Sequence, residues 1–167
     1  MIESENETFL VLSSALCGVS VDSFVAATPP KFPVPGDLNP HNTPIDRNSE
    51  FIRTLREQVG TSAVTSLLER FGHERQTAAS DTVAQNLLRD PEQGPICRSI
   101  MKMWFLGVWF ACDRPYDAHH VISAQAYKDA LVWKVMQSHP MGYSEWTFGY
   151  WADDPPPLET FLTVIDK

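Results

Sequence analysis

Cysteine is scarce in this sequence, and the few cysteines lie in no arrangement that builds a cross-linked or zinc-bound fold. Cys17, Cys97 and Cys112 are an odd number with no CxxC spacing among them. A disulfide framework needs paired cysteines, and ribbon or finger zinc sites need closely spaced ones. We therefore expect three buried thiols in a fold that is held together by a hydrophobic core.

Positive charge is also scarce. There are 13 lysines and arginines against 21 aspartates and glutamates, so the formal net charge is −8 at pH 7. Such a surface repels a phosphate backbone, and no cluster of Lys or Arg offers a local exception. We therefore expect no nucleic acid among the partners.

The N-terminal residues resemble neither an export signal nor a membrane span, so either a signal was removed or the protein stays in the cytoplasm. They are acidic where a secretory or twin-arginine signal would be basic, and the apolar segment 9–16 is too short to cross a bilayer. We expect no direct membrane span and no targeting signal in this chain, which leaves a cytoplasmic location open.

Glycine motifs for cofactors and nucleophiles are missing. No two of the eight glycines are two residues apart, the spacing that lets a dinucleotide-binding turn approach the pyrophosphate. There is also no Gly-Lys-Ser/Thr phosphate loop and no Gly-x-Ser-x-Gly elbow. We therefore assign the chain no catalytic residue, no cofactor-binding residue and no metal ligand, and we expect it not to be catalytic by itself.

What the sequence does contain is helical periodicity. Its 167 residues are 43% hydrophobic and 20% charged, which suits one domain with its own core. Apolar residues recur at helical spacing and signals for β-strands are weak, so we predict a single all-α domain over 1–167, an irregular array of about five to seven helices. The predicted helices are 9–16, ended by Gly18; 51–59, ended by Gly60; 64–71, ended by Gly72; 83–88, capped by Ser80 and ended by Pro91 and Gly94; 95–112, begun by Pro95; and 123–136, capped by Ser123.

Two segments should lack regular structure. Six prolines between Pro29 and Pro44 remove backbone donors and forbid a helix, so we predict a long proline-rich loop over 29–48. The segment 140–167 should be an extended tail, and residues 142–157 hold five aromatic side chains. Full burial of such a side chain is worth roughly 1.5 to 3 kcal/mol, so the tail should lie either on its own domain or on another subunit.

The predicted helix 95–112 has no polar face. Ile100, Met103 and Trp104 lie on one side, while Phe105 and Trp109 lie on the other. A helix that is apolar all round is either central in its own core or shared between its fold and a partner. This helix is therefore a candidate partner surface.

One cluster has the chemistry of metal ligands. Cys112, Asp113, His119 and His120 supply a thiol, a carboxylate and imidazoles, all of which can bind zinc. Adjacent histidines point in different directions in most backbones, so structural histidines are the favoured interpretation. A small metal-dependent enzyme that uses Cys112, His119 and His120 stays open as an alternative.

Three motifs, in this order, resemble a known family. They are Met103-Trp104-Phe105-Leu106-Gly107, then Ala126-Tyr127-Lys128-Asp129-Ala130-Leu131, then Gly149-Tyr150-Trp151-Ala152-Asp153 with a proline close behind. The opening segment 8–16, followed by Gly18, also resembles the first helix of that family. The sequence is similar to the small subunit of bacterial FAD-dependent sorbitol, fructose and glucose dehydrogenases.

The resemblance implies a heteromeric oxidoreductase. The partner would be a catalytic large subunit of the glucose-methanol-choline type that carries FAD, and this chain would stabilise it, aid its folding or export, and hold no cofactor. A cytochrome c subunit would be a further partner, in the periplasm or at the inner membrane. The residues expected at the interface are Trp104, Phe105, Trp109, Tyr127, Trp133, Trp146, Tyr150, Trp151 and Asp153. A self-contained helical adaptor for an unrelated protein is the other alternative.

Overall fold

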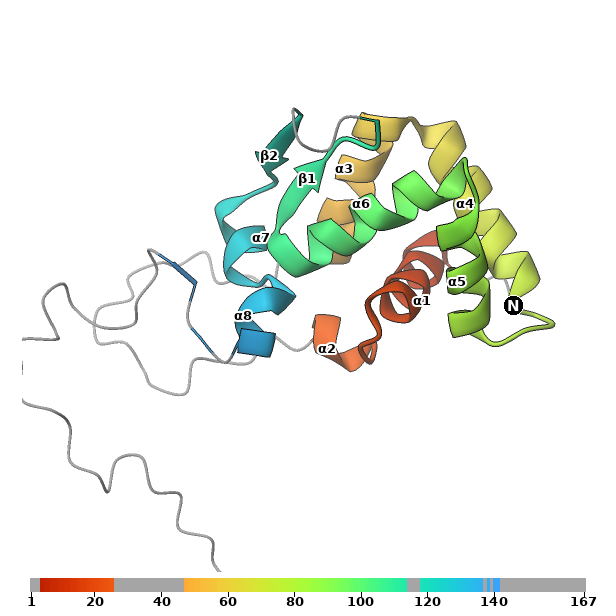
Figure 1. Cartoon of the computed structure of the whole chain (residues 1–167), viewed down its shortest axis with the longest axis horizontal. Coiled ribbons are helices and arrows are strands. Elements are labelled where there is room, and N and C mark those ends of the chain that lie inside the picture. Colours follow the sequence, from red (N-terminus) through yellow and green to blue (C-terminus); the bar gives the residue numbers. More distant parts are fainter. Residues whose placement is uncertain (1–3, 26–46, 114–117, 137, 139, 142–167) are drawn as a thin grey trace, which may run out of the picture.

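The computed structural model describes residues 4–25, 47–113, 118–136, 138, 140 and 141, and these form a helical bundle with a small β-ribbon at one end (Figure 1). In chain order the elements are α1 (Glu5–Cys17), α2 (Asp22–Val25), α3 (Arg47–Val59), α4 (Thr61–Glu74), α5 (Ser80–Arg89), α6 (Gln93–Leu106), β1 (Val108–Phe110), β2 (His119–Val121), α7 (Ala124–Lys128) and α8 (Leu131–Met136). The two strands have three residues each, so the predicted all-α class is confirmed.

The predicted proline-rich loop and aromatic tail lie almost wholly outside the described residues. One boundary of the loop is wrong, because its last two predicted residues, Arg47 and Asn48, already belong to α3. The tail contributes only Pro140 and Met141 to the described part of the chain.

Helix α1 is the centre of the bundle. Its apolar positions Phe9, Leu12 and Leu16 are buried, as their spacing predicts, because α3, α4, α5 and α6 all pack against it. Gly18 ends the helix in the left-handed conformation, with φ of +68°, and its N–H donates to the carbonyl of Ser14. The predicted helix and its glycine stop are therefore confirmed.

A glycine corner joins α3 to α4. Gly60 has φ of +92° and lies between the last residue of α3, Val59, and the first turn of α4. The predicted stop at Gly72 is wrong, because α4 continues to Glu74. A Cβ at Gly72 would contact Thr8 of α1 at 3.9 Å, so this glycine lies on the side of α4 that packs on the central helix. That packing outweighs the helix-propensity cost of glycine, about 1 kcal/mol.

Asp90 builds the turn between α5 and α6. Its carboxylate accepts hydrogen bonds from the guanidinium of Arg70 in α4 (2.7 Å) and from the backbone N–H groups of Gln93 (3.0 Å) and Glu92 (2.9 Å). These bonds, chiefly the one from Arg70, lower the pKa of Asp90 from 3.8 to about 2. Helix α6 therefore begins at Gln93, ahead of its expected first residue, Pro95.

The long apolar helix ends at Leu106, well before the expected position 112. Gly107 has φ of +67°, and the chain then forms β1, which pairs antiparallel with β2 so that Val108 lies opposite Val121. A Cβ at position 107 would lie 2.5 Å from the carbonyl oxygen of Ala126, so glycine is required where α7 passes the end of α6. The apolar residues after Gly107 suit either a helix or a strand, and the glycine ends the helix so that a strand follows.

The last predicted helix is divided in two. Ser123 caps α7 as expected, but α7 ends before Asp129 and α8 begins at Leu131. Asp129, in the break, accepts a hydrogen bond from the guanidinium of Arg47 in α3 (2.9 Å), and Arg47 is only 9% exposed. This ion pair holds the break against the beginning of α3.

Candidate protein-interaction site

Two of the tryptophans expected at a partner interface contribute instead to the core of this chain. Trp104 is 5% exposed and Trp109 is 3% exposed. Trp104 packs edge-to-face on Phe24 of α2 and on Phe51 of α3, with ring centroids 4.2 and 4.6 Å apart. Both tryptophans therefore stabilise this fold and have almost no surface left for a partner.

Three other predicted interface residues keep some exposed surface. Phe105 is half-buried, and Tyr127 and Trp133 form an edge-to-face pair with centroids 5.2 Å apart. The indole N–H of Trp133 donates to the carbonyl of Tyr127 at 2.7 Å, which joins α7 to α8. The four expected interface residues Trp146, Tyr150, Trp151 and Asp153 lie outside the described residues.

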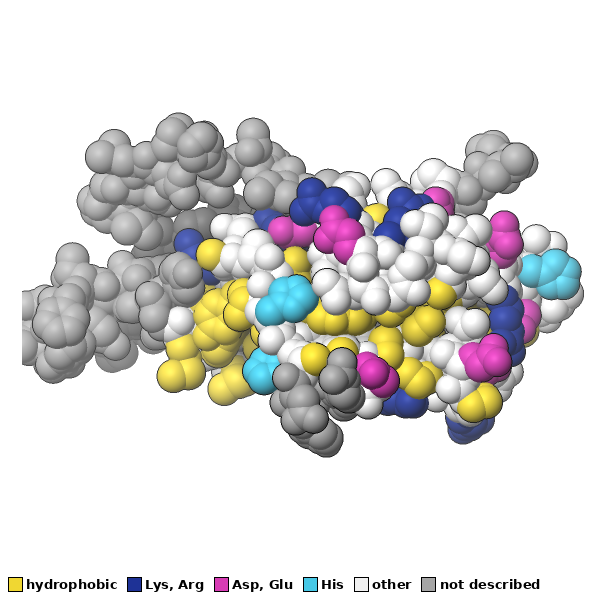
Figure 2. All heavy atoms as spheres, turned by 90° about the horizontal axis from the view of Figure 1, so that it is seen from above, with side chains coloured by type: hydrophobic (Ala, Val, Ile, Leu, Met, Phe, Trp, Pro, Cys, Tyr) yellow, Lys and Arg dark blue, Asp and Glu magenta, His cyan; other side chains and the backbone are white. Residues whose placement is uncertain are grey.

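Large hydrophobic side chains are exposed on the last residue of α6, on β2, on α8 and just after α8. They are Leu106 (37%), Val121 (54%), Val135 (69%), Met136 (61%) and Met141 (74%), and we call them the α8-end surface. Helix α8 packs on α6, and α7 packs on both α6 and β2, so α6 and α7 link the elements that carry four of these residues, while Met141 lies beyond α8. Figure 2 shows hydrophobic side chains gathered on the side of the molecule where Figure 1 places α8.

The cysteine and histidines considered for a metal site have other surroundings. The hydroxyl of Ser99 donates to the carbonyl of Phe110 at 2.8 Å and lies 3.5 Å from the sulfur of Cys112. The ring of His119 stacks on Phe110 at 5.5 Å, while His120 is the next residue of β2 and therefore points to the opposite face of the ribbon. Among the described residues, no group of three or more His, Cys, Asp or Glu side chains could hold a metal ion.

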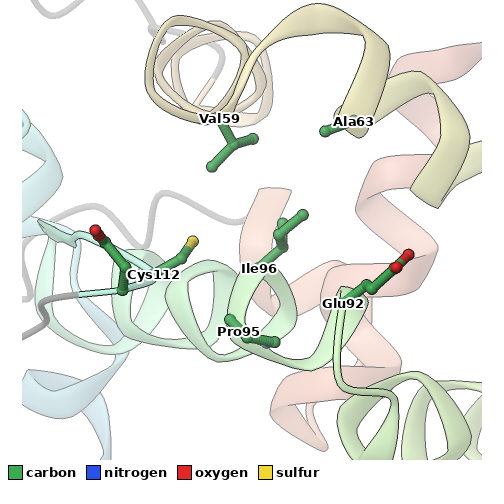
Figure 3. A pocket seen from close by; sticks show the side chains of 7 residues that line it. Val59, Ala63, Glu92, Pro95, Ile96 and Cys112 are labelled. Carbon is green, nitrogen blue, oxygen red and sulfur yellow. The ribbon is translucent and has the colours of Figure 1, made fainter.

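An apolar groove of about 340 Å³ lies between the α3–α4 corner and helix α6. Its lining residues are Val59, Ala63, Glu92, Pro95, Ile96, Cys112 and Asp113. In the close-up, Val59 and Ala63 form one wall, Pro95 and Ile96 form the other, and Cys112 and Glu92 lie at opposite ends (Figure 3). Seen from above, hydrophobic side chains show between the charged ones on this side of the molecule (Figure 2).

Sequence reasoning missed this groove. Its lining comes from the end of α3, the beginning of α4, the beginning of α6 with its N-cap Glu92, and the residues after β1. Of the lining residues, the sequence identifies only Cys112 and Asp113 as candidates for a site, and as metal ligands. No pattern along the chain indicates that these four short pieces share one hollow.

The thiols of α1 and α6 are not reactive groups. Burial raises the pKa of Cys17 and of Cys97 to about 12, because the charged thiolate is poorly solvated inside the core. Neither residue lines the groove. Of the three thiols expected to be buried, Cys97 is buried, whereas Cys17 and Cys112 are half-buried against the core.

No protein-family model matches this chain, and no curated protein or solved structure matches it either. None of the helices in the part of the chain that the structure describes has the length and apolar composition needed to cross a membrane.

Proposed function

We propose that this chain is a non-catalytic helical subunit that binds a larger protein through its α8-end surface. The observation that supports this proposal is the exposure of five large hydrophobic side chains, of which Val135 and Met136 lie on α8 and Leu106 lies on α6, the helix on which α8 packs. Apolar surface of this kind is typical of protein interfaces, and methionine adapts well to a partner's shape. Burial on a partner would remove this area from water, at roughly 25 cal/mol per Å².

The partner that we propose is an FAD-containing catalytic large subunit of the glucose-methanol-choline type, in a sugar, polyol or alcohol dehydrogenase. This identity is supported by the three motifs in the sequence. Two of them adjoin the α8-end surface, since the motif 103–107 contains Leu106 and the motif 126–131 runs from α7 to the first residue of α8. The large subunit would hold the flavin and the catalytic residues, and this chain would stabilise it.

The test is co-expression of the tagged chain with a glucose-methanol-choline large subunit from the same genome. Purification through the tag should give a yellow complex with a flavin spectrum and equal amounts of the two chains. A variant carrying Val135→Lys and Met136→Lys should lose most of the bound flavoprotein, because it places two charges in the proposed interface. Its matched control is Gln85→Lys, at an exposed position of α5 near the other end of the bundle (Figure 1).

Two results would count against the proposal in different ways. If the second chain in the complex is colourless, the partner is not a flavoprotein. The chain would then be an adaptor that uses the same surface to bind an unrelated protein. Equal recovery of the flavoprotein by the double variant and by the control would show that the α8-end surface is not the interface.

A further inference from the structure

We propose that the apolar groove is a second docking site, which binds a protein segment whose apolar side chains are flanked by Lys or Arg. The groove is lined by α3, α4, α6 and the residues after β1. None of its lining residues belongs to the α8-end surface. The site therefore goes beyond the proposed function and does not depend on the identity of the flavin partner.

The interior of the groove suits aliphatic side chains. Its two walls are Val59 with Ala63 and Pro95 with Ile96, and the open space beside them is about 340 Å³ (Figure 3). Sites for small molecules place a few convergent polar groups to orient the ligand. Between the two walls the described lining has no such polar group. The apolar side chains of a protein segment do not need one.

The charges at the ends indicate which segment would bind. Glu92 lies at one end and Cys112 at the other (Figure 3), Asp113 also lines the groove, and the described lining residues include no Lys or Arg. The whole chain carries a net charge of −8. An apolar segment with Lys or Arg on either side complements this field, and one with Asp or Glu is repelled by it.

A synthetic peptide pair tests this chemistry on the full chain. The probe is an amphipathic helix of Leu and Lys about 14 residues long, or roughly four turns, and its control has Glu in place of every Lys. The readout is the rate at which iodoacetamide modifies Cys112, followed by mass spectrometry. Saturating Leu/Lys peptide should slow this reaction about tenfold, and the Leu/Glu peptide should leave it unchanged.

Variants at the walls and ends separate groove binding from non-specific attraction. Ala63→Phe fills the groove and should weaken binding of the Leu/Lys peptide about tenfold. Ser66→Phe adds the same ring at an exposed position of the same helix and should bind like the parent chain. Glu92→Lys should also weaken binding and reduce its salt dependence, whereas Glu69→Lys, at another exposed position of α4, should do neither.

Three results would overturn the proposal. One is unchanged binding by the Ala63→Phe variant, provided that its melting curve matches that of the Ser66→Phe control. Another is equal binding of the Leu/Glu peptide, which would exclude the charge preference. The third is a Cys112 that reacts in the free chain as slowly as the fully buried Cys97, because the chain itself would then fill the groove.

Discussion

Replacement of Gly107 by alanine should destabilise the fold far more than the same replacement at Gly18. Both glycines end a helix with nearly the same left-handed φ, +67° and +68°, so both variants share a backbone strain of about 1–2 kcal/mol. Their surroundings differ. No atom lies within 4 Å of a Cβ built at Gly18, whereas one built at Gly107 lies 2.5 Å from the carbonyl oxygen of Ala126 and 2.6 Å from the Cα of Tyr127.

The additional cost at Gly107 comes from moving a backbone. The clashing atoms belong to α7, which cannot turn aside as the end of a flexible side chain would. Overpacking of this kind costs typically about 1–3 kcal/mol, so the total for Gly107→Ala should be about 2–5 kcal/mol. Gly18→Ala should cost only the strain, about 1–2 kcal/mol.

Urea denaturation followed by circular dichroism measures both free energies of unfolding. Tryptophan fluorescence adds a local readout, because the indole of Trp133 contacts Tyr127 and should report a displaced α7 in the Gly107 variant alone. If the two variants lose the same stability, then α7 does not pack on the turn after α6, and the account of why that helix ends there is wrong.

Three further predictions follow from single contacts. Arg47→Met should lower the free energy of unfolding by about 2–4 kcal/mol, because it removes the cation that pairs with Glu50 and Asp129 in a mostly buried cluster. Asp129→Asn should cost about 1 kcal/mol or less, because Asp129 is partly exposed. Equal losses of stability in the two variants would contradict this prediction. The pKa of Asp90 is about 2 in the folded state against an ordinary value of 3.8, so its stabilising effect is present above about pH 4 and is lost as the pH falls towards 2. In the Asp90→Asn variant the melting temperature should therefore depend less on pH over that range. The same pH dependence in the variant and the parent chain would refute this prediction. Ellman's reagent at pH 8 should modify Cys112 in the groove well before Cys97, whose pKa is about 12, and similar rates would show that Cys112 is not accessible.

Local patterns predicted much of the fold because each relevant signal lies within one or two helical turns. The i, i+3, i+7 spacing of Phe9, Leu12 and Leu16 identifies the buried side of α1, and Gly18 supplies the left-handed stop. The same reasoning found the corner at Gly60. It failed at Gly72, where a glycine packs against α1 without ending its helix.

The candidate sites were less predictable. Apolar character alone does not say whether a side chain faces its own core or solvent. The sequence therefore placed Trp104 and Trp109 at an interface, although both are buried in the core of this chain. Val135 and Met136 followed the helical pattern of the last segment, but the break at Asp129 ends α7 and begins a separate short helix on which both are exposed. Exposure depends on which elements meet, which is not a local property.

The sequence by itself determined the helical class, the apolar face of α1 with its glycine stop, and the absence of the common cofactor motifs, because periodicity, caps and motif spacing are properties of neighbouring residues. Only the tertiary structure decided where α6 ends, since the need for glycine at position 107 comes from the passage of α7, which lies nearly twenty residues further along the chain. The tertiary structure also creates the groove, because its lining forms only when four short segments of the chain pack together.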